Sequence, residues 1–209
     1  RERLDKIASY LGLDFDYFSA ISKNDEQILR KYGTAFMTPS QKACYLSHYF
    51  IYKEIIYKGY NNALILEDDA DFELNITAIM TDIHRDLPAS WETLYIGHCF
   101  EPVGEQVGRS SSVHRLYKSV VPMCLHAYAV SYSGACKLIE LLDPVIPLGP
   151  VDFSVSLVVN DRKVNSFSVH PPTISQWKAP DNTSDIPASK IISFSLLNST
   201  LHFLGHNSY

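Results

Sequence analysis

The sequence is organised around one stretch, Ala63-Leu64-Ile65-Leu66-Glu67-Asp68-Asp69-Ala70-Asp71-Phe72. Its first four residues form a short apolar run, which is typical of a strand buried on both faces of an α/β sheet. Three consecutive carboxylates follow, and we expect them at the carboxyl end of that strand, where open α/β sheets bind ligands. Adjacent negative charges repel one another, which costs stability unless a cation or a donor-rich ligand is bound there. A solvated acidic turn remains the alternative interpretation.

Length and composition predict one folded domain. The 209 residues are 46% hydrophobic and 20% charged, so we expect a single domain over residues 1–209 with a substantial core. The net charge of −5 argues against a nucleic-acid-binding protein, because phosphate contacts need a basic face. The net charge does not exclude an anionic substrate, since a bound divalent cation can reverse the local charge. No apolar run approaches the roughly 18 residues of a membrane span, although an anchor or a signal peptide could precede Arg1.

The cysteines do not have the spacing of a zinc site. They are Cys44, Cys99, Cys124 and Cys136. Cys99 and Cys124 each lie at the edge of an expected strand, so they are the preferred pair if a disulfide forms. Buried free thiols are the alternative.

Three motifs for N-glycosylation bear on the compartment. They are Asn75-Ile76-Thr77, Asn182-Thr183-Ser184 and Asn198-Ser199-Thr200. Their number favours the lumen of the secretory pathway (ER or Golgi) if the host is eukaryotic, whereas a bacterial host would imply a cytoplasmic protein. Asn75 is also a plausible helix cap, and capping would compete with glycosylation.

Helix and strand signals alternate along the chain. Thr38 can cap a helix, Pro39 suits its first position, and Gln41 completes a capping box. We therefore predict a helix over residues 39–58 that ends at Gly59. Further helices are predicted over residues 3–11, 75–87 and 134–142, the last of them capped by Ser133.

Strands are predicted over residues 93–96, 117–121, 125–131 and 164–169. Residues 98–112 are expected to form a mobile surface loop, and periodicity does not decide whether residues 151–159 are helical or extended. Because strands alternate with helices, the pattern predicts an α/β fold with a central, mostly parallel mixed sheet flanked by helices.

Several short motifs occur in order between about positions 3 and 185. They are Leu11-Gly12-Leu13-Asp14-Phe15, Thr38-Pro39, Ala43-Cys44-Tyr45-Leu46-Ser47-His48, the stretch from Ala63 to Ala70, Trp91-Glu92-Thr93-Leu94-Tyr95-Ile96-Gly97, His126-Ala127-Tyr128-Ala129-Val130-Ser131, Gly134-Ala135, Pro150-Val151-Asp152, Pro171-Pro172 and Gln176. Taken together, these motifs resemble glycosyltransferase family 25. That family includes bacterial lipooligosaccharide galactosyltransferases and eukaryotic collagen galactosyltransferases.

The resemblance implies a GT-A-like domain that binds a nucleotide sugar, with UDP-galactose or a relative as donor and Mn²⁺ as the cation. A hexose would pass to a hydroxyl of a glycan or of a hydroxylysine-type protein acceptor. In this family pattern Asp69 would contact the metal and Glu67 would be its partner, since positions 67 and 69 share a side of an extended strand. Asp68 would point the other way, toward the donor ribose or a backbone donor.

The resemblance also implies an inverting reaction, which requires a base for the acceptor hydroxyl. Asp152, which follows a proline-rich loop, is the candidate base, and a helix N-cap is its alternative role. His48, together with Ser47, would brace the donor pocket from the helix, and a structural role is the alternative for both. His170 is considered as a third metal ligand, although a structural role is favoured for it.

The chain departs from the family pattern at its start. Family members begin with a strand that supports the nucleotide base, whereas this sequence opens at Arg1-Glu2-Arg3, inside or after the loop that follows that strand. A non-catalytic family member that acts as a binding or adhesion module is therefore the alternative function. A calcium-stabilised structural domain is a third reading of the acidic triplet.

Overall fold

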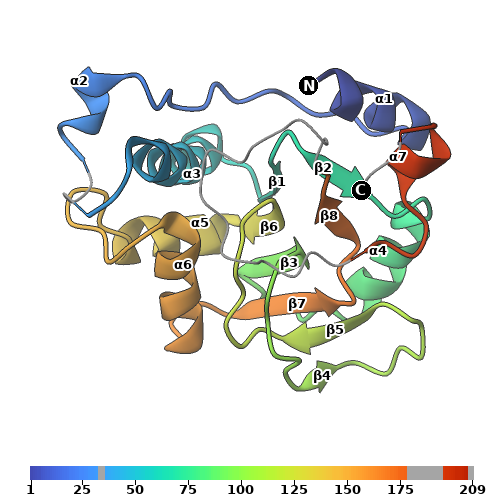
Figure 1. Ribbon diagram of the computed structural model, residues 1–209. Helices are drawn as coiled ribbons and strands as arrows, with labels where there is room; N and C mark the ends of the chain where they lie inside the picture. Colours follow the sequence, from blue (N-terminus) through green and yellow to red (C-terminus); the bar gives the residue numbers. More distant parts are fainter. Residues whose placement is uncertain (33–35, 178–194, 207–209) are drawn as a thin grey trace.

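A computed structural model describes residues 1–32, 36–177 and 195–206, which form an α/β fold around a six-stranded mixed sheet (Figure 1). The strands of this sheet run in the order β1-β6-β3-β7-β5-β4. Their bounds are β1 (Asn62–Leu66), β3 (Thr93–Gly97), β4 (Gln106–Val107), β5 (Arg115–Lys118), β6 (Ala127–Ser131) and β7 (Ser166–His170). A separate pair, β2 (Ala70–Phe72) and β8 (Ile174–Gln176), is antiparallel.

The sheet is mixed, as expected, but it is not mostly parallel. Only β3 and β7 run parallel, and the other four neighbouring pairs are antiparallel. Cys99 and Cys124 form a disulfide, as expected, which ties the end of β3 to the residues just before β6. Strand β6 thus starts near the end of β3, which fits its antiparallel pairing with β3 and with β1 on its other side.

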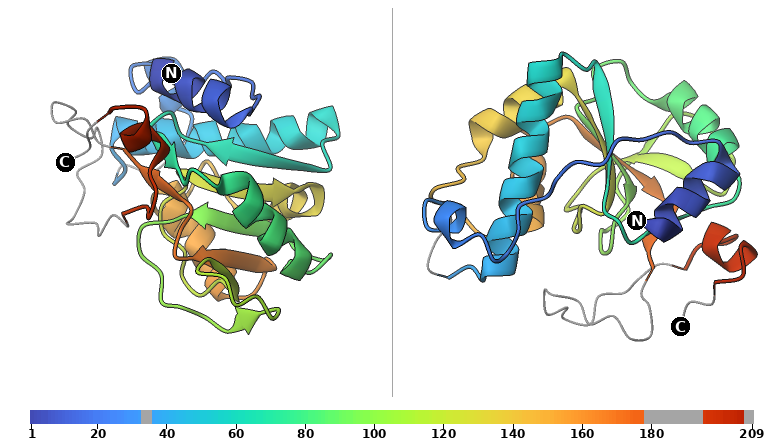
Figure 2. Two further views of the ribbon diagram at one scale, coloured as in Figure 1. Left: turned by 90° about the vertical axis from the view of Figure 1, so that its right-hand side faces the viewer. Right: turned by 90° about the horizontal axis from the view of Figure 1, so that it is seen from above.

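Helices cover the two faces of the sheet as separate layers (Figure 2). The bounds of the longer helices are α1 (Glu2–Leu11), α3 (Pro39–Lys58), α4 (Ile76–Asp86), α5 (Tyr132–Leu141) and α6 (Val151–Asn160), and the short ones are α2 (Glu26–Leu29) and α7 (Thr200–Phe203). Helices α3, α5 and α6 share one hydrophobic core with Tyr95 and Tyr128. Helices α1 and α4 and the β2–β8 pair share the other core with Leu94 and Ile96. The alternation of side chains along β3 thus supplies both cores.

Strand β1 lies at the edge of the sheet and is not buried on both faces, contrary to the expectation from its apolar run. Within the described residues its one strand partner is β6. Ile65 is buried, whereas Leu64 is 49% exposed. Apolar continuity alone therefore does not distinguish a central strand from an edge strand.

Some of the predicted helix caps are present in the structure and others are not. The capping box at the start of α3 is confirmed, since Thr38 accepts from the Gln41 N–H and Gln41 accepts from the Thr38 N–H. Gly59 ends this helix in the left-handed region, with φ of 66°. Ser131, not Ser133, caps α5. Asn75 stands at the N-cap position of α4 without a capping hydrogen bond from its side chain.

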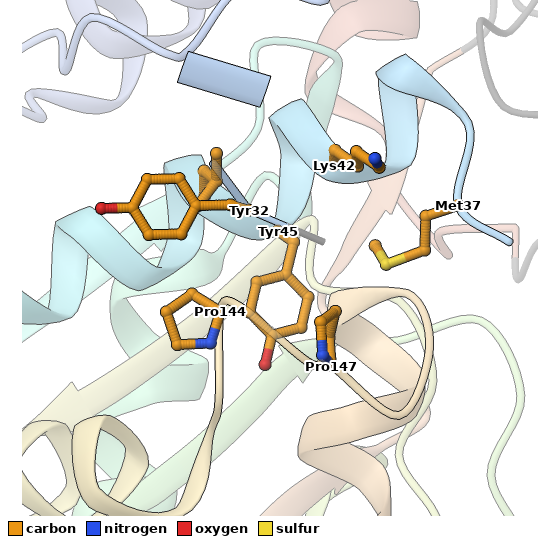
Figure 3. Close-up of a pocket in the computed structure, with 7 residues that line it drawn as sticks. Tyr32, Met37, Lys42, Tyr45, Pro144 and Pro147 are labelled. Carbon is orange, nitrogen blue, oxygen red and sulfur yellow. The ribbon is translucent and has the colours of Figure 1, made fainter. Parts of the chain in front are cut away.

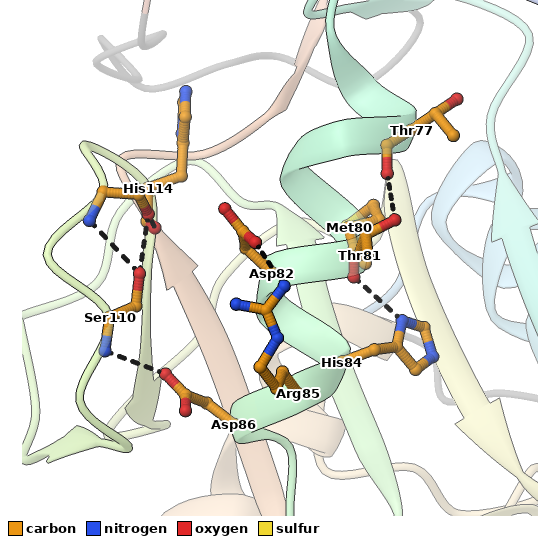
Figure 4. Close-up of polar contacts among 10 residues, drawn as sticks. Thr77, Met80, Thr81, Asp82, His84, Arg85, Asp86, Ser110 and His114 are labelled. Carbon is orange, nitrogen blue, oxygen red and sulfur yellow. Dashed lines mark hydrogen bonds and ion pairs between the residues drawn. The ribbon is translucent and has the colours of Figure 1, made fainter.

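The segment expected to be a mobile loop is partly ordered by the sheet and by α4. It contains β4, which pairs with β5, and Asp86 of α4 accepts a hydrogen bond of 3.1 Å from the Ser110 N–H (Figure 4). The undecided residues 151–159 are helical, because they fall within α6. None of the helices in the described ranges is long and apolar enough to cross a membrane.

Candidate functional site

The acidic triplet lies where β1 ends and the chain turns toward β2. The strand ends at Leu66, and Asp68 and Asp69 form the turn. Asp68 is exposed, whereas Glu67 and Asp69 are half-buried, and the Asp69 carbonyl accepts a hydrogen bond of 2.7 Å from the Trp177 N–H. Since the triplet is not extended, positions 67 and 69 are not on one side of a strand, contrary to the expectation. Their assignment as metal ligands stays a prediction.

Glu67 has two side-chain partners. His48 Nε2 lies 3.6 Å from Glu67 Oε1, and Gln176 Nε2 donates to Glu67 Oε2 over 3.3 Å. Burial opposes the charge on His48, but interactions with the Cys44 thiol and the Glu67 carboxylate outweigh it and raise the pKa of His48 to about 10. Burial likewise opposes ionisation of Glu67, yet His48 lowers the pKa of this carboxyl below its usual range. The two groups therefore form an ion pair at neutral pH.

A buried chain of hydrogen bonds holds His48 from behind. Its Nδ1 lies 2.8 Å from the Tyr128 hydroxyl, which lies 2.8 Å from the Tyr52 hydroxyl. His48 itself is only 5% exposed. It thus lies between Glu67 and Tyr128 and helps to orient the Glu67 carboxylate, and its expected role in a donor pocket stays a prediction. Ser47 plays a different part, since its hydroxyl accepts the Ile21 N–H and anchors the segment before α2.

Asp71, the fourth carboxylate of the stretch, belongs to the fold. It is buried and accepts hydrogen bonds from the Ser199 hydroxyl and from the Leu201 N–H at 3.0 Å. These contacts join β2 to the start of α7. Leaving Asp71 out of the candidate ligands agrees with this structural role.

Asp152 lies in the first turn of α6, with Pro150 at the N-cap position. It is therefore not the N-cap residue, which was its alternative role. Its Oδ1 accepts a 2.9 Å hydrogen bond from the Phe153 N–H. Burial is the main cause that raises the pKa of Tyr95 well above its usual range, and the Asp152 carboxylate adds to this rise. Tyr95, whose ring stacks on that of Tyr128, therefore stays neutral.

Two residues near Glu67, Gln176 and His126, had no predicted role. Gln176 comes from β8, and the buried His126 precedes β6 and places its Nε2 3.3 Å from the Ile174 carbonyl. Burial lowers the pKa of His126, although the Glu67 charge opposes this shift. The sequence offered one signal for Gln176 and His126, since each is a polar residue at the end of a strand. Their proximity to Glu67 arises from the pairing of β6 with β1 and of β8 with β2.

His170 lies at the same end of the strands as Glu67, but on a strand further into the sheet. It is the last residue of β7, and β6 and β3 lie between β7 and β1 in the strand order. Its neighbours are His98 and Glu101. The structure does not bring His170 together with Glu67.

A small depression between α3 and the proline-rich loop does not coincide with these residues (Figure 3). It contains about 140 Å³ of empty space and is lined by Tyr45, Pro144 and Pro147, among others. Pockets for drug-sized ligands have volumes of about 300–1,000 Å³. The depression is too small for a nucleotide sugar, and the acidic turn remains the candidate site.

The chemistry of the acidic turn fits a hard divalent cation. Glu67, Asp68 and Asp69 offer only carboxylate oxygens, the ligands preferred by Mg²⁺ and Mn²⁺. The turn stands at a strand end and is partly open to solvent. A cation there would also balance three adjacent negative charges, one of which His48 already offsets.

The chain is similar to known glycosyltransferases. Residues 1–155 match the family model described as glycosyltransferase family 25 (LPS biosynthesis protein). The chain is 26% identical over 139 residues to procollagen galactosyltransferase 1 of Danio rerio, an alignment that covers 65% of the chain and 23% of the relative. It is 28% identical over 139 residues to procollagen galactosyltransferase 2 of Mus musculus, covering 65% and 22%.

A third relative carries a different description. The chain is 28% identical over 147 residues to the inactive glycosyltransferase 25 family member 3 of Homo sapiens, covering 66% of the chain and 24% of that protein. The alignments thus span about a quarter of the length of these three curated relatives.

Proposed function

Because the chain belongs to glycosyltransferase family 25, we propose that residues 1–209 act as a single catalytic domain that transfers a hexose from a UDP-sugar. Galactose is the sugar proposed first, since two of the relatives described above are named procollagen galactosyltransferases. The acceptor would be a hydroxyl of a glycan or of a hydroxylysine-type side chain, and the reaction would invert the anomeric centre.

The observation that carries this proposal is the support of Glu67. Its carboxylate is kept ionised by His48 and is oriented by Gln176, and His48 is fixed in turn by the buried Tyr128. Support of this kind from an outer shell is what a metal-ligating carboxylate requires. A Mn²⁺ ion on Glu67 and Asp69 would neutralise negative charge on the leaving nucleoside diphosphate.

The other site residues take roles that follow from their exposure and position. Asp68 is exposed beside Glu67 and would bind the donor, at a ribose hydroxyl. Asp152 would accept the proton of the acceptor hydroxyl from the start of α6. His48 would support the donor pocket through Glu67.

The experiment is titration of the protein with UDP-galactose in the presence of Mn²⁺, followed by an assay of galactose transfer to hydroxylysine peptides and to glycans. Asp69→Asn should lower turnover at least about 100-fold, because a charged ligand is lost at the reacting diphosphate. The matched control is Asp82→Asn, since Asp82 lies on α4 in an exposed pair with Arg85. The proposal fails if UDP-galactose does not bind with Mn²⁺, or if both variants keep full activity.

A second candidate function is a non-catalytic binding or adhesion module. It is favoured by the similarity to a relative named inactive, and by the fact that both Glu67 oxygens already have protein partners. Such a module would bind its partner equally well after Asp69→Asn and would show no stabilisation by UDP and Mn²⁺.

The compartment proposed for this domain is the lumen of the secretory pathway. The disulfide between Cys99 and Cys124 supports it, since disulfides persist in oxidising compartments. The match to vertebrate procollagen galactosyltransferases is the second support. Occupied glycans at Asn75 or Asn198, detected by mass spectrometry, would establish lumenal exposure.

A further inference from the structure

A second cluster of ligating side chains lies at the ends of β3 and β7, away from the acidic turn. His98 directly follows β3, Glu101 lies three residues further on, and His170 is the last residue of β7. The two imidazole rings are 4.5 Å apart between centroids, and His170 Nε2 lies 3.5 Å from Glu101 Oε2. One nitrogen from each histidine and one oxygen of Glu101 all lie within 4.8 Å of one another.

The cluster is buried but incompletely satisfied. His98, Glu101 and His170 are 2%, 7% and 8% exposed. Glu101 Oε1 accepts a 2.7 Å hydrogen bond from the Val120 N–H, whereas Glu101 Oε2 and His170 Nε2 have no hydrogen-bond partner among the described residues. A carboxylate oxygen removed from water without such a partner is costly. Their one mutual contact is the 3.5 Å approach of Glu101 Oε2 to His170 Nε2, and a cation bound to both atoms would satisfy them better than this long contact does.

His98 is oriented as a metal ligand would be. Its Nε2 lies 3.1 Å from the Val169 carbonyl, which can only accept, so Nε2 carries the proton. The other ring nitrogen, Nδ1, then bears the lone pair in the neutral ring. A hydrogen bond from the distal nitrogen to a backbone carbonyl is the usual outer-shell support for a ligating histidine.

We propose that His98, Glu101 and His170 bind Zn²⁺. Two imidazole nitrogens and one carboxylate oxygen form a donor set that suits zinc better than manganese or magnesium. With metal–ligand distances of about 2.0–2.1 Å, the edge of a tetrahedron is about 3.3 Å. The observed 3.5 Å between His170 Nε2 and Glu101 Oε2 is close to that edge.

This site is independent of the proposed donor site. His98 follows β3, two strands from β1, and His170 ends β7, three strands from β1, so with a strand spacing of about 4.8 Å the two sites are about 10–14 Å apart. Cys99 cannot join the zinc ligands, because it is bonded to Cys124. The ion would fasten the segment after β3 to the end of β7, and its binding energy would add to the stability of the folded chain.

The test is a cobalt titration of the chelator-treated protein with its disulfide intact and without a histidine tag. Co²⁺ should produce visible d–d absorption that saturates at one equivalent and disappears when Zn²⁺ is added, whereas Mn²⁺ should not displace it. Zn²⁺ should also raise the melting temperature. Glu101→Gln and His170→Asn should each weaken Co²⁺ binding at least about 10-fold. The matched control is His84→Asn on α4, where the histidine is exposed.

Two results would overturn the proposal. One is the absence of a visible band and of any thermal shift with Zn²⁺, which would leave Glu101 and His170 as a buried ion pair. The other is a thiolate-to-cobalt charge-transfer band that is lost in Cys44→Ser, which would place the ion at Cys44, His48 and Glu67. If the variants do not fold, X-ray absorption of the zinc-loaded native protein decides, since sulfur scattering contradicts the site and two imidazoles support it.

Discussion

Replacement of Tyr128 by phenylalanine tests the hydrogen-bond chain behind Glu67. The hydroxyl of Tyr128 lies 2.8 Å from both His48 Nδ1 and the Tyr52 hydroxyl, and Tyr52 and Tyr128 are fully buried. Its removal deprives two buried groups of a partner at once. Each such loss costs about 1–3 kcal/mol, so we expect Tyr128→Phe to lower the free energy of unfolding by about 2–4 kcal/mol.

Tyr95 offers a matched control within the same aromatic stack. Its ring stacks on that of Tyr128 at 5.8 Å, and it too is fully buried. In the described part of the chain, however, the Tyr95 hydroxyl has no hydrogen-bond partner. Tyr95→Phe removes an unpaired polar group and should leave stability unchanged or raise it by about 1 kcal/mol.

Urea unfolding followed by tryptophan fluorescence measures both variants, with equal m-values required for the comparison. The double variant Tyr52→Phe/Tyr128→Phe should cost less than the sum of its single changes, because the two hydroxyls are partners. The reasoning is refuted if Tyr95→Phe destabilises the protein as much as Tyr128→Phe does.

Two further predictions concern the framework around the site. The double variant Cys99→Ala/Cys124→Ala removes a disulfide that spans 25 residues, and it should lower the free energy of unfolding by about 3–4 kcal/mol. The control is Cys44→Ala/Cys136→Ala, which removes two free thiols and should cost clearly less in the same urea titration. Gly134→Ala should lower the free energy of unfolding by about 1–3 kcal/mol, because its new Cβ would lie 2.2 Å from the Glu92 carbonyl oxygen. Gly149→Ala, whose nearest contact is the movable Phe153 ring at 3.0 Å, is the comparison, and an equal effect would contradict the steric argument.

Local chemistry made the helices predictable. The start of α3 follows from three residues, Thr38, Pro39 and Gln41, whose interactions are complete within one turn. Its end follows from Gly59, which adopts a left-handed conformation without strain. The pairing of Cys99 with Cys124 was also accessible, because both cysteines flank expected strands.

The directions of the strands were not accessible in the same way. Residues 127–131 and 93–97 have similar apolar patterns, and nothing in either pattern says that β6 runs against β3. That direction depends on the path by which the chain returns to the sheet, which neither apolar pattern encodes. The position of β1 at the edge of the sheet was not predictable either, because Leu64 is apolar although it is exposed.

The candidate site was predicted as a set of separate residues and not as an arrangement. Glu67 and His48 were both named from motifs, but their contact depends on how α3 packs beside β1. The cluster of His98, Glu101 and His170 left no signal in the sequence as a group. Its members are up to 72 positions apart and meet because β3 and β7 are parallel and end at the same edge.

The hydrogen-bond chain that starts at Tyr52 has a consequence for recombining this domain with its relatives. Helix α3 contributes Tyr52 and His48, while Tyr128, 80 positions after His48, comes from β6. An exchange of α3 alone would pair the new helix with the original Tyr128, and Glu67 would lose the support for its orientation wherever the new helix lacks a histidine at position 48. Chimeras of this domain should therefore transfer α3 and β6 as one inseparable block.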